Sequence, residues 1–199
     1  MKVELIAITA DAEELIELAA RTCYQSGDKT AAGGAGKFLG RLIASGHESP
    51  FEHAYATFRL SGCSRAMTHQ LVRHRLLAVS QKSQRYVTEG NFEYVVPPSI
   101  GNGFADEFKA DMEAIRAMYR KWKERGLKNE DARYVLPNAC ASELVISGNF
   151  RAFRHIFKVR CSPRAQWEIR QACDRMLLLL HARAPSVFGD LMGLIADPG

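Results

Sequence analysis

Residues 54–60 read Ala-Tyr-Ala-Thr-Phe-Arg-Leu, a stretch in which small or apolar side chains alternate with bulkier or polar ones. Alternation with a period of two predicts a β-strand that buries one face and exposes the other. The buried face would carry Ala54, Ala56, Phe58 and Leu60, and the exposed face Tyr55, Thr57 and Arg59. Soon afterwards Ser64 can cap a helix, which we expect to run to about Arg75. This passage from strand to helix indicates a fold that mixes both kinds of element.

The rest of the chain adds few strands and many helices. Strands are expected at residues 3–9 and 92–96, and polar or glycine-rich loops at residues 80–84 and 26–36. Helices are expected after Asp11, at residues 37–45, 104–125 and 129–136, after Asn149, and at residues 164–182. Helices that surround a few strands predict one α+β domain over residues 1–199.

The composition excludes several classes of protein. Hydrophobic residues make up 47% of the 199 residues and charged residues 25%, which excludes a disordered or collagen-like chain. Glu4 interrupts the first apolar run, and no stretch approaches the ~20 apolar residues of a membrane span. We therefore expect a cytoplasmic protein with no membrane partner. The cysteines at positions 23, 63, 140, 161 and 173 form no CxxC pair, which favours buried, unreactive thiols over disulfides or a zinc site.

Positive charge is concentrated in two stretches that contain no acidic residue. The first lies between Glu52 and Glu89, and the second between Glu143 and Glu168. Together they hold nine Arg and two Lys. Arg presents a planar fork of donors that suits phosphate and carboxylate groups. The pattern therefore predicts a site for an anionic ligand such as a nucleotide, a phosphorylated cofactor or a nucleic acid.

One segment of the first stretch is dense enough to be a binding site by itself. Gln70, Arg73 and His74 are expected to share one face of the helix that precedes the polar loop. The tripeptide Arg-His-Arg at residues 73–75 is followed by seven residues and then by Ser83. Arginines at a helix end, next to a loop of small donors, are typical of a phosphate cradle.

The chain resembles the flavin-dependent thymidylate synthases in five motifs that occur in the order expected for that family. The most specific is Arg-His-Arg followed by seven residues and Ser, at residues 73–83. The others are Ala-Arg-Thr-Cys-Tyr at 20–24, His-Glu-Ser-Pro-Phe-Glu-His at 47–53, Ala-Arg-Tyr-Val-Leu-Pro at 132–137, and Asn-Phe-Arg-Ala-Phe-Arg-His at 149–155 with Arg160 beyond it. The similarity covers about residues 15–190.

This resemblance implies a fold, a reaction and a set of partners. The fold would be a small, mainly antiparallel sheet packed with several helices. The reaction would make dTMP from dUMP, with FAD as cofactor, NADPH as reductant and methylenetetrahydrofolate as carbon donor, and it would release tetrahydrofolate. Neither a metal nor a nucleic acid is expected as a partner. A homotetramer whose active sites are shared between subunits is implied as well.

The resemblance also assigns roles by position in these motifs. The residues expected to hold FAD are His47, Ser49, Glu52, Arg73, His74, Arg75, Asn149, His155 and Arg160. The residues expected to hold dUMP are Gln70, Gln81, Ser83, Gln84, Arg85, Arg133 and Arg160. Tyr24 is expected to wall the pocket.

Arg160 and Ser83 are the candidate catalytic residues. Arg160 would lie between nucleotide and flavin, where it could stabilise negative charge on the uracil as C6 accepts a hydride. Ser83 could be a nucleophile, but no general base is evident beside it in the sequence, so we assign it to binding the phosphate or the uracil.

Some positions depart from the family pattern, and other functions stay open. Ala78 replaces a common Ser, and Ser80-Gln81 stands where some relatives have Asn-Glu. A basic nucleic-acid-binding protein and a catalytically silent flavin- or nucleotide-binding protein are the main alternatives. A metal hydrolase that uses the histidines is a further one, although their spacing matches no HExxH motif.

Overall fold

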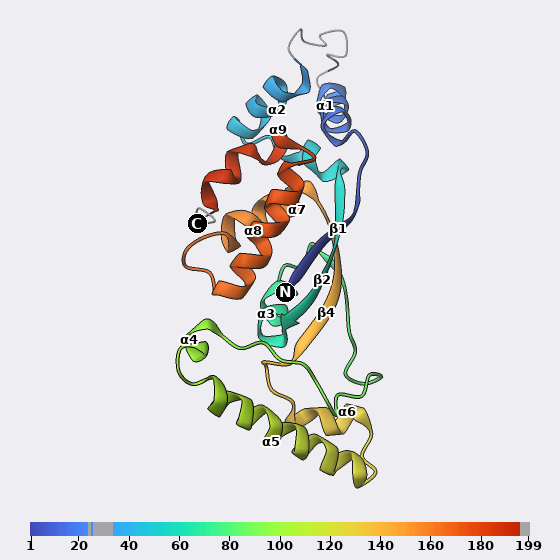
Figure 1. Ribbon diagram of the computed structural model, residues 1–199. Helices are drawn as coiled ribbons and strands as arrows, with labels where there is room; N and C mark the ends of the chain where they lie inside the picture. The colour runs from blue at the N-terminus through green and yellow to red at the C-terminus, as the bar shows by residue number, and fades with distance from the viewer. Residues whose placement is uncertain (24, 26–33, 196–199) are drawn as a thin grey trace. The chain divides into compact units, whose positions relative to one another are not determined.

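Four strands form one sheet in the computed structural model, which describes residues 1–23, 25 and 34–195 (Figure 1). Their order across the sheet is β1 (Lys2–Ile8), β2 (Tyr55–Ser64), β4 (Ala141–Asn149) and β3 (Ala78–Gln81). Neighbouring strands are antiparallel. On β2 and β4, for example, Thr57 meets Ser147, whereas Cys63 meets Ser142. The expected α+β fold with a mainly antiparallel sheet is therefore confirmed.

Two of the three predicted strands form, and two observed strands were not predicted. Residues 3–9 and 54–60 correspond to β1 and β2 within a few residues. The predicted strand at residues 92–96 is wrong, because only Tyr94 forms a bridge, to Cys140. Part of the reason is that the Phe92 carbonyl accepts a hydrogen bond from the side chain of Arg116 rather than from a strand.

Strand β4 was missed because its buried face does not look hydrophobic in the sequence. Ser142, Leu144, Ile146 and Gly148 alternate with half-buried residues along it. Serine and glycine interrupt the apolar pattern on which the sequence prediction relied. The loop predicted at residues 80–84 was partly wrong as well, because β3 reaches Gln81.

The chain divides into two compact units, and both long strands contribute residues to each of them. Unit 1 comprises Met1–Lys2, Leu60–Arg73 and Ser80–Leu144. It contains α3 (Arg65–Leu71), α4 (Pro98–Gly101), α5 (Ala105–Glu124), α6 (Asn129–Ala132) and the 3₁₀ helix η3 (Arg133–Val135). Helices α5 and α6 lie side by side (Figure 1). The buried Tyr119 joins them, because its hydroxyl lies 3.3 Å from the Asn129 Oδ1 atom.

Unit 2 comprises Val3–Arg59, His74–Val79 and the chain from Val145 onward. It contains α1 (Ala12–Cys23), α2 (Gly34–Ala44), the 3₁₀ helix η2 (Ser49–His53), α7 (Phe150–Arg160), α8 (Trp167–His181), α9 (Pro185–Phe188) and η4 (Gly189–Leu194). Its core is rich in phenylalanine, and the rings of Phe150, Phe157 and Phe188 meet edge to face or stack with neighbours. Helices α7 and α8 pack together (Figure 1).

Capping explains where two of the helices begin. The Ser64 Oγ atom accepts a hydrogen bond from the Met67 amide at 3.0 Å, and the Asn149 Oδ1 atom accepts one from the Ala152 amide at 2.8 Å. Both caps confirm the sequence predictions. None of the helices in the described ranges is both long and apolar enough to span a membrane.

Helix α3 ends at Leu71, so the predicted helix to Arg75 was too long. The chain turns after Val72, and this turn brings Leu77 into the core, where it is 9% exposed, against Gly148 of β4. A Cβ atom at position 148 would lie only 2.5 Å from the Leu77 Cδ2 atom. Arg73 and His74 therefore lie in a turn, and they do not share a helical face with Gln70 as predicted.

Candidate functional site

The site is best defined in unit 2, where two segments far apart in the sequence meet. The Nε atom of Arg160, in the last turn of α7, donates a hydrogen bond of 3.0 Å to the Nε2 atom of His74. His74 lies in the turn that the burial of Leu77 fixes. Burial lowers the pKa of His74 below its usual value, and the positive charge of Arg160 and the nearby His155 lower it further. The imidazole is therefore held neutral at neutral pH.

A cavity of about 540 Å³ lies in the same unit, and three residues expected to hold FAD line it. These are Glu52 of η2, Asn149 at the cap of α7, and His155 on the next turns of that helix. Leu76, whose side chain is 78% exposed, also lines the cavity and presents an apolar surface to it. The cavity thus combines polar groups with an apolar wall, as cofactor sites commonly do.

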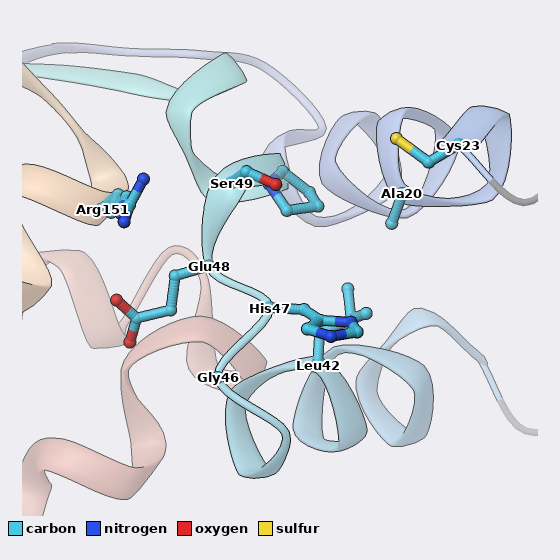
Figure 2. Close-up of a pocket in the computed structure, with 9 residues that line it drawn as sticks. Ala20, Cys23, Leu42, Gly46, His47, Glu48, Ser49 and Arg151 are labelled. Atoms are coloured by element: carbon cyan, nitrogen blue, oxygen red, sulfur yellow. The ribbon is translucent and has the colours of Figure 1, made fainter.

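A second cavity, of about 380 Å³, is lined by His47 and Ser49 (Figure 2). With Glu52, these are the residues of the motif at 47–53 that are expected to hold FAD. Figure 2 shows the side chains of His47 and Glu48 on opposite sides of the backbone, between α2 and η2. Cys23 of α1 lines this cavity too. Tyr24, which was predicted to wall the pocket, lies outside the described residues.

Glu48 and Arg151 line both cavities, and the sequence prediction assigned no role to either. Burial alone would raise the pKa of Glu48, but the hydrogen bond and charge of Lys158, together with Arg154 and Arg151, outweigh it and lower that pKa. Arg151 forms an ion pair with Glu52. Both residues belong to motifs quoted above, so their position beside predicted ligand residues was an available signal.

Arg154 is the most deeply buried charge in this region. Its side chain is fully buried, and its guanidinium is bidentate to Asp190 of η4, at 2.7 and 2.8 Å. It also donates to the Val187 carbonyl and lies 3.7 Å from the Glu48 carboxylate. Arg154 therefore ties α7 both to the last helical turns and to the segment that lines the two cavities.

Most residues expected to hold dUMP lie in unit 1, and several of them are already bonded. The Gln81 Nε2 atom donates to the hydroxyls of Thr68 and Ser142, at 2.9 and 3.0 Å. Ser83 Oγ accepts the Arg85 amide at 3.2 Å, which shapes the loop after β3. These hydrogen bonds are made within the protein itself.

One of the arginines expected to hold dUMP is paired with an acid in unit 1. Arg85 lies 2.9 Å from the carboxylate of Glu130, and the Nε atom of Arg133 donates to the backbone carbonyl of the same residue at 3.2 Å. Gln70 is half-buried and Gln84 is buried, whereas Arg73 is exposed. Arg73 makes no ion pair with any described residue.

The expectation that the two acid-free stretches lack acidic partners is only partly correct. At least five of their positive residues reach acids in other described parts of the chain, which the sequence spacing could not show. These residues are Lys82 with Glu89, Arg85 with Glu130, Arg151 with Glu52, Arg154 with Asp190, and Lys158 with Glu48. Among the described residues, Arg73, Arg75 and Arg160 make no ion pair, and all three belong to the predicted ligand sets.

The cysteines behave largely as expected. Four are buried, and Cys23 is exposed. Burial raises the pKa of the Cys140 thiol to about 12, and it raises the pKa of Cys161 and Cys173 as well. Thiols with raised pKa values are poor nucleophiles. Within the ranges that the structure describes, no group of three or more His, Cys, Asp or Glu residues is arranged to hold a metal ion.

The fold and these clusters together define a class, an α+β protein whose arginines without an ion pair among the described residues suit an anionic ligand. Comparison with known proteins shows the family within that class. Residues 4–186 match the family described as thymidylate synthase complementing protein, and the chain belongs to this family. The resemblance found in the motifs is thereby confirmed.

Individual relatives agree with this assignment. The chain is 42% identical to the flavin-dependent thymidylate synthase of Nitratidesulfovibrio vulgaris, with 94% of this chain and 85% of the relative covered. It is also 42% identical to that of Geobacter sulfurreducens, with 100% and 88% covered. A crystal structure of ThyX from Helicobacter pylori, complexed with FAD and dUMP, is similar with a TM-score of 0.82 and 25% identity, and covers 96% of this chain and 100% of that one.

Proposed function

We propose that this protein is a flavin-dependent thymidylate synthase that methylates dUMP to dTMP. Membership of the family and the names of relatives at 42% identity support this proposal. The structural observation that carries it is the meeting of His74 with Arg160, in the unit whose cavity is lined by Glu52, Asn149 and His155. These five residues come from three of the quoted motifs, and the resemblance in sequence assigns all of them to FAD.

The residues present fit FAD. Its two phosphates need positive groups, and Arg75 and Arg160 make no ion pair with described residues, so both are available for an anion. Its ring needs an apolar surface with a few donors, which Leu76, Asn149 and His155 offer. Bound FAD would supply the hydride chemistry, whereas the protein supplies orientation and electrostatics. The remaining assignments to FAD are His47, Ser49, Glu52, Arg73 and His74.

For dUMP, the phosphate would be bound by arginines and the uracil by amides. Arg85 and Arg133 are the phosphate candidates, and the loop at Ser83 adds a hydroxyl. Gln70, Gln81 and Gln84 would position the base. Arg160 would stabilise negative charge that develops on the uracil carbonyls. Ser83 would bind rather than attack, since no general base accompanies it in the part of the chain that the structure describes.

The other partners follow from the same reaction. NADPH would be the reductant, methylenetetrahydrofolate the carbon donor, and tetrahydrofolate the product. A homotetramer with shared active sites would act in the cytoplasm. The resemblance in sequence supports each of these points, and each needs its own measurement.

The first experiment measures the visible absorption of the purified protein after incubation with FAD and removal of free cofactor. We expect a retained flavin spectrum, and NADPH oxidation that dUMP stimulates. Arg75→Ala should weaken FAD binding at least about tenfold, because it removes a charge-assisted contact. Arg183→Ala, an exposed arginine of the same unit, serves as the matched control and should bind FAD normally. A protein that stays colourless as a correctly sized oligomer would refute the proposal.

Turnover separates this function from a silent flavin-binding protein. Formation of dTMP from dUMP, methylenetetrahydrofolate and NADPH should require FAD. A flavin spectrum without dTMP formation would instead favour the binding protein. Tight, salt-sensitive binding of oligonucleotides without binding of dUMP would favour the nucleic-acid alternative.

A further inference from the structure

The contact between Arg160 and His74 has a consequence for the position of a proton. A guanidinium nitrogen can only donate hydrogen bonds. The His74 Nε2 atom, 3.0 Å from the Arg160 Nε atom, must therefore accept with a lone pair. A neutral imidazole carries one proton, so that proton lies on Nδ1. The geometry thus selects one of the two neutral tautomers.

The surroundings of His74 disfavour the alternative, a protonated imidazolium. Its second N–H would point at the N–H of Arg160, and its charge would lie near two other basic groups. Both of those groups, Arg160 and His155, come from α7. The half-buried position of His74 also removes water that would stabilise the cation. The sequence neighbours Arg73 and Arg75 are positive as well.

Both partners keep their other polar atoms available. Within the described residues, the Nδ1 atom of His74 makes no hydrogen bond, and the terminal nitrogens of Arg160 make no hydrogen bond or ion pair. Arg85 of unit 1 differs, because its guanidinium is taken up by Glu130. The Nε contact thus orients Arg160 without using the edge of the guanidinium that could meet an anion or a carbonyl oxygen.

We propose that Arg160 is the positioning residue for His74: it holds the imidazole as the Nδ1-protonated tautomer, so that His74 presents a single, directed hydrogen-bond donor to an acceptor atom of the bound flavin. The choice of flavin as the recipient rests on the proposed function. The selection of the tautomer does not, because it follows from the protein alone. Arg160 thereby has two tasks, one toward His74 through Nε and one toward substrate through its terminal nitrogens.

The test reads the tautomer directly, in the protein without FAD. Long-range ¹H–¹⁵N correlation spectra of ¹⁵N-labelled protein distinguish a protonated ring nitrogen from one with a lone pair, and His74→Gln identifies the signals. We expect protonated Nδ1 and unprotonated Nε2 at neutral pH. In Arg160→Met, which removes the donor, this preference should be lost and the pKa of His74 should rise toward its usual value. Protonated Nε2 in the wild type, or an unchanged tautomer in Arg160→Met, would overturn the proposal.

Two further measurements keep the outcomes separate. Arg160→Gln retains an amide donor on a shorter side chain, so a partial return of the tautomer in this variant supports hydrogen bonding over a loss of folding. The pH dependence of flavin reduction should then shift in Arg160→Met and be partly restored in Arg160→Gln. If the wild type shows the expected tautomer but never retains FAD, the proposed function fails while the role of Arg160 stands.

Discussion

The two units use arginine in different ways. In unit 1, Arg85 is paired with Glu130, and both side chains are partly exposed. In unit 2, Arg75 and Arg160 make no ion pair with described residues, whereas the buried Arg154 is held by Asp190. Arg85 of unit 1 is thus weakly neutralised, whereas Arg75 and Arg160 of unit 2 are unpaired among the described residues and Arg154 is locked.

This difference separates binding residues from structural ones. An exposed ion pair contributes about 0–1 kcal/mol, so an incoming phosphate can replace the carboxylate at little cost. A buried, bidentate pair cannot be released in that way, because its loss leaves a charge without water. We therefore expect Arg85 to exchange Glu130 for a ligand, and Arg154 to remain in place throughout.

The largest effect should come from Arg154→Ala. Removing this fully buried side chain leaves Asp190 and Glu48 without their shared partner, and should lower the free energy of unfolding by about 3 kcal/mol or more. Arg151→Ala, one turn earlier on the same helix and exposed, is the control and should cost under about 1 kcal/mol. Urea unfolding of both variants measures the difference. Equal losses would show that burial does not distinguish the two arginines.

A second large effect is expected at Gly148, where β4 approaches the turn that carries His74. Gly148→Ala would place a Cβ atom 2.5 Å from Leu77 and should cost about 1–3 kcal/mol. Displacement of Leu77 should also move His74, so FAD retention should fall. Gly40→Ala has open space around its Cβ atom and lies in α2, so it should leave FAD binding unchanged and stabilise slightly. Normal FAD retention in Gly148→Ala would separate the turn from the cofactor site.

The fold around these residues also shows which elements the sequence could predict. Two local signals were reliable: the cap at Asn149 and the long helix at residues 104–125 both formed, the latter as α5. Strand β4 was missed in part because Gly148 has no side chain and so interrupts the apolar pattern. The missing side chain is, however, what leaves room for Leu77. The need for glycine at position 148 thus comes from a contact with a segment some seventy residues earlier, which no local pattern contains.

The membership of the candidate site stays a prediction from the motifs, and the contacts between its residues could not be predicted from the sequence. Motif positions identified His74 and Arg160, yet only the fold brings them to 3.0 Å. The same motifs also identified Glu52 as a candidate FAD ligand, but they did not indicate its ion pair with Arg151. Ion pairs between distant segments depend on tertiary packing. The two acid-free stretches therefore suggested more unpaired positive charge than the folded protein has.

A moderate effect, of the opposite sign, is expected at Glu130. If its carboxylate competes with the phosphate of dUMP for Arg85, Glu130→Gln should tighten dUMP binding by about two- to fivefold, the equivalent of an exposed ion pair. Arg85→Ala should weaken the same binding. Calorimetric titration of the FAD-loaded protein measures both. Weaker binding in Glu130→Gln would mean that the acid positions Arg85 for the ligand and does not compete with it.

The smallest effect concerns Glu48, the acid that lines both cavities of unit 2. Lys158, Arg154 and Arg151 together lower its pKa below the usual 4.5, against the effect of burial. A carboxyl whose pKa is lower in the folded state contributes stability above its unfolded pKa, and loses it as the pH falls through the folded pKa. The unfolding free energies of wild type and Glu48→Gln should therefore differ most at pH 7, and converge as the pH falls through the lowered pKa of Glu48.

The size and the direction of this pH effect test the comparison between the units. Because Glu48 is partly exposed, we expect a difference well under that for Arg154→Ala, and closer to that of a surface pair. Lys158→Met should abolish most of the pH dependence, since Lys158 contributes both the hydrogen bond and the nearest charge. A difference that grows as the pH falls would mean that burial, rather than the three basic residues, controls this carboxylate. Glu48 would then be a candidate proton donor beside the cavities, and would no longer resemble the paired acid Glu130 of unit 1.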